Sequence, residues 1–287
     1  MRDLRTDHRW LSLNTATVRK QGSLIEIIDA CARRGIRAID PWRDQVAAVG
    51  LDRAVKAVRD AKLELSGYCR GGMFPANAAH RQQVREDNCR AVDEAKALGS
   101  PCLVLVVGGL PQYSRPGSAP SKDLAAAHAQ AEDSIAELLE YARSAEMPLS
   151  IEPLHPMFAA DRACVNSMRQ ALDICDRLDP KRSGALGVAL DVYHVWWDFE
   201  LAAQIKRCGL KRMHAFHVCD WLVPTTDMLN DRGMMGDGVI DIPRIRSDVE
   251  ALGFSGYVEV EIFSNHWWGL SMDEVITTCI SRMKSAV

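Results

Sequence analysis

The feature that most constrains the fold is a regular alternation of short apolar runs with longer amphipathic stretches. Eight such pairs follow one another along the 287 residues, without a change of composition that would mark a linker. Short strands that alternate with helical patterns indicate βαβ units and a parallel sheet, and a closed barrel of eight units needs about 250 residues. We therefore predict an α/β fold made of a single (β/α)8 TIM barrel that spans residues 1–287.

The apolar runs place the strands, and the periodic stretches between them place the helices. Strands are predicted at residues 10–14, 38–40, 63–68, 102–107, 149–151, 185–190, 212–216 and 257–262. Helices are predicted over residues 23–35, 50–62, 78–98, 124–145, 167–178, 200–208, 242–252 and 272–283. Ser23 followed by Glu26 is a capping-box pattern, and Gly99 is a typical helix end. The stretch 111–121 is rich in Pro, Gly and Ser, which indicates an exposed loop.

Composition and charge argue against several functional classes. The net charge is −3, unlike the basic footprint of a nucleic-acid-binding protein. The nine cysteines contain no CxxC pair, which indicates a reducing compartment. The charged N-terminus lacks the apolar core of a signal peptide, no apolar run reaches the ~20 residues of a membrane span, and no Gly-x-Gly-x-x-Gly follows the first strand. We therefore expect a cytoplasmic protein without nucleic-acid or membrane partners, and the missing glycine motif removes the main reason to expect a dinucleotide-binding fold.

Metal-binding side chains lie at the ends of the last four predicted strands. These residues are Glu152, Asp191, His217 and Glu261. Because active-site residues of a TIM barrel sit at the C-terminal ends of its strands, the four should be neighbours on one half of the rim. Two glutamates, an aspartate and a histidine form a hard, oxygen-rich set suited to a divalent cation. We hypothesise that they hold one divalent metal ion, Mn²⁺ by preference, with Mg²⁺, Co²⁺ or Zn²⁺ as alternatives.

Two of these strands offer a competing candidate. His214 lies three positions before His217, so the two rings face opposite sides of the strand and only one can reach the metal. Glu259 lies two positions before Glu261 and shares its face, so the choice between them stays open, with Glu261 nearer the rim. Glu259 is otherwise expected to be a deeper polar residue paired with an Arg or a Lys. Asp220 is a candidate partner that orients the His217 ring.

Other residues near the predicted rim are candidates for substrate contact. His155 follows the strand that ends at Glu152, Arg70 lies in a predicted loop at 69–72, and Trp42 and Arg43 follow the strand at 38–40. Arginines at such places bind carboxylate or phosphate groups, or they simply close the barrel mouth. Tryptophans that would stack on a sugar or form a subunit interface gather in the loops after the last three strands: Trp196, Trp197, Trp221, Trp267 and Trp268.

Over most of its length the chain resembles the xylose-isomerase-like TIM-barrel superfamily of sugar phosphate isomerases and epimerases, which includes the ketose 3-epimerases and endonuclease IV. The resemblance is motif-specific from Glu152 onward. The motifs that carry this resemblance are Ile-Glu-Pro at 151–153, Leu-Asp-x-x-His at 190–194, Phe-His-Val-x-Asp at 216–220 and Arg-x-x-x-Gly-x-Gly at 232–238. The resemblance implies that the four strand-end residues are the metal ligands and that His194 and Arg232 contact the substrate. It also implies a homo-oligomer, a dimer or a tetramer, that acts on a small carbohydrate.

The chemistry expected at such a site is proton transfer next to a carbonyl group. A Lewis acid stabilises the enediolate, while Glu152 and Glu261 act as general base and general acid on opposite faces of the substrate. We therefore predict a metal-dependent sugar isomerase or epimerase. The alternatives are a lyase or decarboxylase acting on a keto-sugar or sugar acid, an endonuclease-IV-like phosphodiesterase, which needs more ligands than the sequence places, and a barrel that only binds a sugar or a protein.

Overall fold

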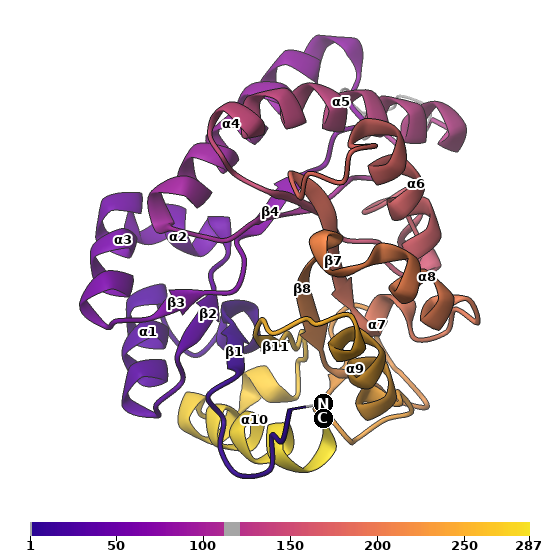
Figure 1. Cartoon of the computed structure of the whole chain (residues 1–287). Coiled ribbons are helices and arrows are strands. Elements are labelled where there is room, and N and C mark those ends of the chain that lie inside the picture. Colours follow the sequence, from indigo (N-terminus) through magenta and orange to yellow (C-terminus); the bar gives the residue numbers. More distant parts are fainter. Residues whose placement is uncertain (1, 112–120) are drawn as a thin grey trace.

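Among the residues that the structure describes, 2–111 and 121–287, parallel strands form one curled sheet inside a ring of helices (Figure 1). The protein is represented by a computed structural model. The strands of this sheet are β1 Leu11–Asn14, β2 Ala38–Asp40, β3 Glu64–Leu65, β4 Cys69–Gly72, β5 Leu103–Val106, β6 Leu149–Ile151, β7 Leu186–Asp191, β8 Met213–Val218 and β11 Val258–Val260. Their order is β3-β2-β1-β11-β8-β7-β6-β5-β4. The chain therefore has the predicted α/β TIM-barrel fold.

The helices cover the outside of the sheet and begin and end close to their predicted limits. They are α1 Leu24–Arg33, α2 Arg43–Val49, α3 Leu51–Asp60, α4 Arg81–Leu98, α5 Leu124–Ser144, α6 Met168–Leu178, α7 Val192–Val195, α8 Leu201–Cys208, α9 Ile242–Ala251 and α10 Met272–Ala286. The predicted capping box is confirmed, because Ser23 accepts from the backbone of Glu26 and Glu26 accepts from that of Ser23. Gly99 ends α4 in the left-handed region with a φ of 75°. Of the α-helices in the described residues, α2 and α7 were not predicted.

The segment 64–72 closes the barrel and corrects one sequence prediction. β3 pairs with β2, whereas β4 pairs with β5. The segment therefore acts as one interrupted strand between β2 and β5. The prediction of a strand over 63–68 followed by a loop at 69–72 is wrong, because the strand breaks after Leu65 and resumes at Cys69. A Cβ on Gly72 would lie 2.0 Å from the carbonyl oxygen of Val106, so the close approach of the two strands requires glycine there. Pairing with the fully buried β5 thus overrides the low strand propensity of two glycines.

The other predicted strands are confirmed, with ends shifted by one or two residues. The predicted exposed loop at 111–121 lies almost entirely outside the described residues. None of the described helices has the length and apolarity needed to cross a membrane. A small apolar cluster of Cys69, Cys102, Val104, Ala189 and Ala215 joins the β4–β5 pair to the β7–β8 pair across β6, so it lies inside the barrel.

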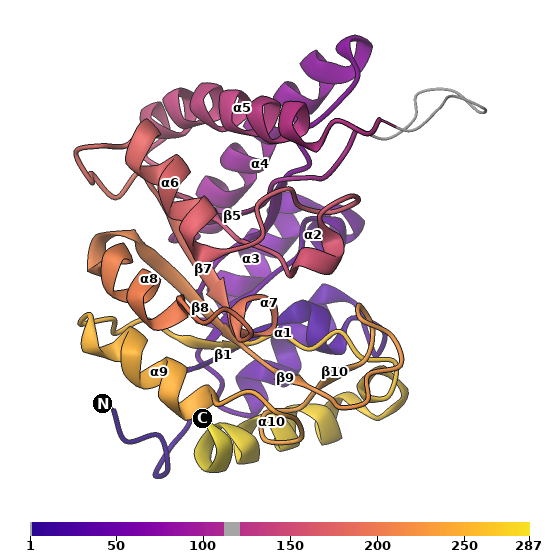
Figure 2. The same cartoon turned by 90° about the vertical axis from the view of Figure 1, so that its right-hand side faces the viewer.

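Strand register brings the candidate ligands to one level of the barrel. Asp191 on β7 is level with His217 on β8, and His217 is level with Glu259 on β11. Glu261 lies two residues farther along and on the same face of the chain as Glu259. At the end of the barrel to which these strands lead, a short antiparallel hairpin of β9 Asp220–Trp221 and β10 Arg232–Gly233 extends outward (Figure 2). The site therefore lies at the C-terminal end of the strands, as predicted.

Candidate metal centre

Four acidic and histidine side chains from neighbouring strands converge at the mouth of the barrel. Glu152, Asp191, His217 and Glu261, which we call the rim quartet, each offer one ligand atom, and these atoms all lie within 4.8 Å of one another. Glu152 follows β6, Asp191 ends β7, His217 belongs to β8 and Glu261 follows β11. All four residues are buried. The sequence reasoning thus selected residues that the fold brings together.

The geometry and chemistry of the rim quartet fit a divalent cation. His217 Nδ1 lies 3.2 Å from Glu152 Oε1 and 3.8 Å from Glu261 Oε2. In the described part of the chain, neither Glu152 Oε1 nor His217 Nδ1 has a hydrogen-bond partner. Buried polar atoms without partners are costly, and a cation between these atoms would satisfy both. Carboxylate oxygens and one imidazole nitrogen are ligands that Mn²⁺, Mg²⁺ or Zn²⁺ accepts.

Burial makes the ionised form of each carboxylate in the rim quartet less favourable. Burial raises the pKa of Glu152 and of Glu261, and it raises the pKa of Asp191 to about 6. Burial alone would lower the pKa of His217, but the charges of Glu259, Glu152 and Glu261 outweigh this effect and raise it well above its usual value. Several acidic groups around one ring create a strongly negative, poorly solvated site. A bound cation stabilises the ionised carboxylates of such a site.

Arg232 and His194, which the resemblance implies contact the substrate, lie directly beside the rim quartet. Arg232 Nη1 donates to Asp191 Oδ2 at 2.9 Å and to Glu261 Oε2 at 3.2 Å. Arg232 Nη2 lies 3.1 Å from His194 Nε2. His194 Nδ1 accepts the backbone N–H of His155 at 3.2 Å. Burial, followed by the positive charge of Arg232, lowers the pKa of His194 well below its usual value, so this ring is neutral.

The structure separates the competing candidates on β8 and β11. His214 Nδ1 lies 2.8 Å from Ser150 Oγ, away from the rim quartet, and burial lowers its pKa to about 4. His217 is therefore the histidine that faces the site. Glu261 belongs to the rim quartet, whereas Glu259 lies deeper and groups with His217 and Asp40.

Glu259 forms a polar layer under the rim quartet, although not with the partner that we expected. Its Oε1 lies 3.5 Å from His217 Nε2 and accepts Asn14 Nδ2 at 2.8 Å. Its Oε2 accepts the Ser66 hydroxyl at 2.7 Å. The expected pairing with an Arg or a Lys is wrong, because the barrel interior supplies a histidine, an amide and a hydroxyl instead. Glu259, rather than Asp220, thus lies next to Nε2 of the His217 ring, the nitrogen that faces away from Glu152 and Glu261.

Asp220 has a different role from the one predicted. Its carboxylate accepts the backbone N–H groups of Gly236 at 2.9 Å and Ile240 at 3.0 Å, together with that of Trp221 at 2.9 Å. The prediction that Asp220 orients the His217 ring is therefore wrong. The residue instead fastens the long loop after β8, and this loop carries Arg232.

The sequence reasoning missed Asn14 and Asp40. Asn14 ends β1 and donates to both Glu259 and Glu261, the latter at 3.2 Å. Asp40 ends β2 and accepts the backbone N–H of Cys69 at 3.0 Å. Burial and the charge of Glu259 raise the pKa of Asp40 well above its usual value. Both residues carried the same signal as the rim quartet, a polar side chain at the end of an apolar strand, and that rule applied to all eight strands would have found them.

The remaining rim candidates divide into two groups. His155 packs against Trp221 with ring centroids 4.9 Å apart, and Trp42 Nε1 donates to Asn14 Oδ1 at 2.7 Å, so both lie beside the site. Arg43 does not, because it pairs with Asp87 and Glu94 of α4.

The tryptophans do not form one cluster. Trp221 lies near Trp196 with centroids 5.8 Å apart and near His155, whereas Trp268 packs against Phe263 and donates to the carbonyl of Ala16. Arg232 borders both groups, because its guanidinium lies 4.5 Å from the ring centroid of Tyr193, which stacks on Trp221, and 5.1 Å from that of Phe263.

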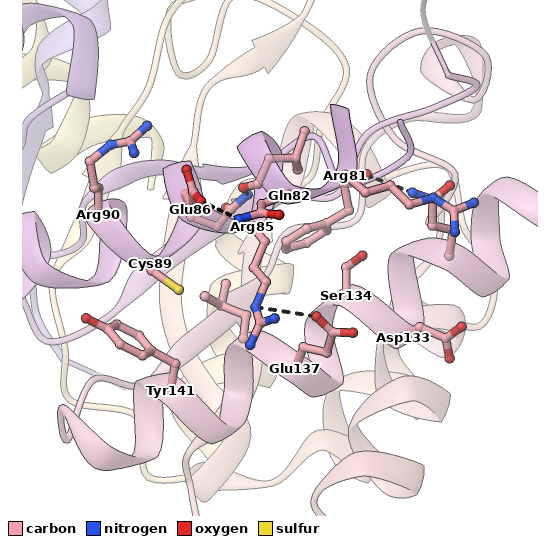
Figure 3. Close-up of a pocket in the computed structure, with 15 residues that line it drawn as sticks. Arg81, Gln82, Arg85, Glu86, Cys89, Arg90, Asp133, Ser134, Glu137 and Tyr141 are labelled. Atoms are coloured by element: carbon pink, nitrogen blue, oxygen red, sulfur yellow. Dashed lines mark hydrogen bonds and ion pairs between the residues drawn. The ribbon is translucent and has the colours of Figure 1, made fainter. Parts of the chain in front are cut away.

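A separate hollow opens between α4 and α5 on the outside of the barrel (Figure 3). No residue of the rim quartet lines it. Arg85 pairs with Glu137 across it at 3.6 Å, and Gln82 donates to Glu86 at 2.9 Å. Because opposite charges at its walls already pair with each other, this hollow does not resemble the rim site in chemistry.

Comparisons with known proteins agree with the fold. A solved structure of a protein from Sinorhizobium meliloti 1021 is 56% identical, with a TM-score of 0.91 over 96% of this chain and 98% of that one. A structure described as the IolI protein with a bound zinc atom has a TM-score of 0.78 at 20% identity, over 94% of each chain. An inosose isomerase of Bacillus subtilis is 26% identical over 149 residues, so the chain matches about half the length of this curated relative, 51% of each protein.

The family comparison covers most of the chain. The family model described as xylose isomerase-like TIM barrel matches residues 25–279, which include the rim quartet, Arg232 and His194. This chain belongs to the xylose isomerase-like TIM-barrel family.

Proposed function

We propose that this chain is a sugar isomerase or epimerase that requires one divalent metal ion held by the rim quartet. The observation that carries the proposal is the convergence of two glutamates, an aspartate and a histidine within 4.8 Å at the barrel mouth. The partial match to inosose isomerases supports a carbohydrate substrate, and the zinc of the IolI structure supports a metal. We expect Mn²⁺, with Mg²⁺, Co²⁺ or Zn²⁺ as alternatives.

The two glutamates have different surroundings, which suggests a division of roles. Glu261 accepts hydrogen bonds from Arg232 at 3.2 Å and from Asn14 at 3.2 Å. Glu152 Oε1 lacks a hydrogen-bond partner among the described residues and lies 3.2 Å from His217 Nδ1. We assign Glu152 the removal of a proton from the carbon beside the substrate carbonyl, and Glu261 the return of a proton. When bound, a divalent cation supplies Lewis-acid stabilisation of the negative charge that develops on the substrate oxygens.

Arg232 and His194 would position the substrate for this transfer. Arg232 reaches the rim quartet through Asp191 and Glu261, and it lies 3.1 Å from the ring of His194. A fixed arginine and a neutral histidine together offer donors to hydroxyl and carbonyl oxygens. Holding those oxygens restricts the substrate to geometries in which the C–H bond faces a carboxylate.

The substitution Glu152→Gln tests this assignment. We expect exchange of the substrate proton with deuterated water to fall at least about a hundredfold, because the base is lost while the shape of the side chain is kept. Proton NMR on the metal-loaded protein, with ketoses and an inosose as probes, measures the exchange. Glu140→Gln on the exposed side of α5 is the matched control.

Undiminished exchange in Glu152→Gln would contradict the assignment of the base. Release of a smaller product by the wild type, without exchange back into the substrate, would instead support the lyase or decarboxylase that uses the same enediolate.

A further inference from the structure

Arg70 is a half-buried arginine at the barrel rim that makes no hydrogen bond or ion pair with the described residues. It lies on β4 between Cys69, level with Val104, and Gly71, level with Leu105. Leu105 is level with Ile151, the residue before Glu152. Two strand spacings of about 4.8 Å put the backbones of Arg70 and Glu152 roughly 10 Å apart. The backbone of Arg70 thus lies within two residues of the level of Glu152, and its charge is unpaired among the described residues.

A second arginine, Arg162, lies on the loop after β6 and is nearly unpaired as well. Its one acidic neighbour, Asp161, is 3.9 Å away and largely exposed, so this ion pair is weak. The guanidinium of Arg162 lies 5.7 Å from the ring centroid of Phe158, and Phe158 in turn packs edge-on against His194 at 5.9 Å. The backbone of this loop is fastened to the end of β5, because Gly108 N–H donates to the Arg162 carbonyl at 2.9 Å.

The two positive charges act on each other. Burial lowers the pKa of Arg70, and the charge of Arg162 lowers it further, while the charge of Glu152 acts in the opposite direction. Other arginines at this rim have partners: Arg43 pairs with α4, and Arg232 pairs with the rim quartet. Two neighbouring cations are unfavourable when both are partly desolvated and one is unpaired while the other has only a weak, exposed ion pair. An anion that joins them would relieve this cost.

We propose that Arg70 and Arg162 bind an anionic group, a carboxylate or a phosphate, at the end of the substrate far from the reacting carbons. The inference rests on the proposed function, since it assumes that the reacting end lies at the rim quartet. Guanidinium groups match the geometry of carboxylate and phosphate oxygens with paired hydrogen bonds. The substrate class is therefore an acidic or phosphorylated keto-sugar rather than a neutral ketose or inosose.

Calorimetric binding to the metal-loaded protein tests this inference with three probes that share one carbon skeleton. D-fructose is neutral, D-fructuronate carries a carboxylate at the sixth carbon, and D-fructose 6-phosphate carries a phosphate there. We expect at least one anionic probe to bind about tenfold or more tightly than D-fructose, the effect of one charge-assisted hydrogen bond. The preferred anion distinguishes a sugar acid from a sugar phosphate.

Arg70→Gln and Arg162→Gln should each reduce that preference about tenfold while leaving the affinity for D-fructose unchanged. Arg53→Gln, on the exposed face of α3, is the control and should behave as the wild type. No preference for either anionic probe in the wild type, or a preference that survives both substitutions, would overturn the inference. Arginine-dependent binding without any proton exchange would instead count against the proposed function and leave the anion site standing.

Discussion

Glu259 lies below the rim quartet on the far side of the His217 ring, where its charge favours one orientation of that ring. Its Oε1 lies 3.5 Å from His217 Nε2 and leaves Nδ1 directed at Glu152 and Glu261. Asn14 and Ser66 fix the carboxylate by donating to its two oxygens. A carboxylate behind a ligating histidine orients the ring and raises its basicity.

The substitution Glu259→Gln removes this charge without changing the size of the side chain. We expect the affinity for Mn²⁺ to fall about 10- to 100-fold, as is usual when such a partner is lost. Titration of the metal-free protein, followed by calorimetry, measures the change, and Glu146→Gln at an exposed site is the control. An unchanged affinity in a folded Glu259→Gln protein would show that Glu259 does not support the ligand.

At the scale of elements, the sequence predicted which side chains converge at the barrel mouth where the relevant signal was local. Each residue of the rim quartet ends an apolar run, and parallel strands bring such ends to one rim, so pattern and topology together found all four. Partners that depend on distant contacts were not predictable in this way. Glu259 pairs with Asn14 from the other end of the chain, and the glycines of β4 form a strand only because β5 lies beside them.

The conformation of the loop after β8 depends on Asp220, two of whose partners lie 16 and 20 residues farther along the chain. Asp220→Ala would leave the backbone N–H groups of Gly236 and Ile240 without their acceptor, and each lost bond to a carboxylate is worth about 1.5–3 kcal/mol. We expect faster proteolytic cleavage within 221–240 and weaker substrate binding, because Arg232 is displaced, with the metal still bound. Asp227→Ala, which affects only contacts to Leu229 and Asn230, is the control. Equal cleavage of the two variants would contradict this role for Asp220.

At the scale of the whole molecule, the site requires both halves of the chain. The rim quartet comes from residues 152–261, but β1 closes the sheet against β11 and supplies Asn14. Arg246 donates to the carbonyls of Arg2 at 2.8 Å and Val287 at 2.9 Å, so residues 2 and 287 lie close together. Closure of the barrel, rather than any single loop, therefore assembles the centre.

The metal content of purified protein tests the central claim most directly. We compare the wild type with Asp191→Ala and His217→Gln, and we use His214→Gln as the matched control because His214 lies on the same strand and faces away from the quartet. Elemental analysis after reloading with Mn²⁺ should give about one ion per chain in the wild type and in His214→Gln, and none in the other two. A wild type that holds no ion after reloading, or an Asp191→Ala protein that keeps it, would contradict a metal centre at the rim quartet.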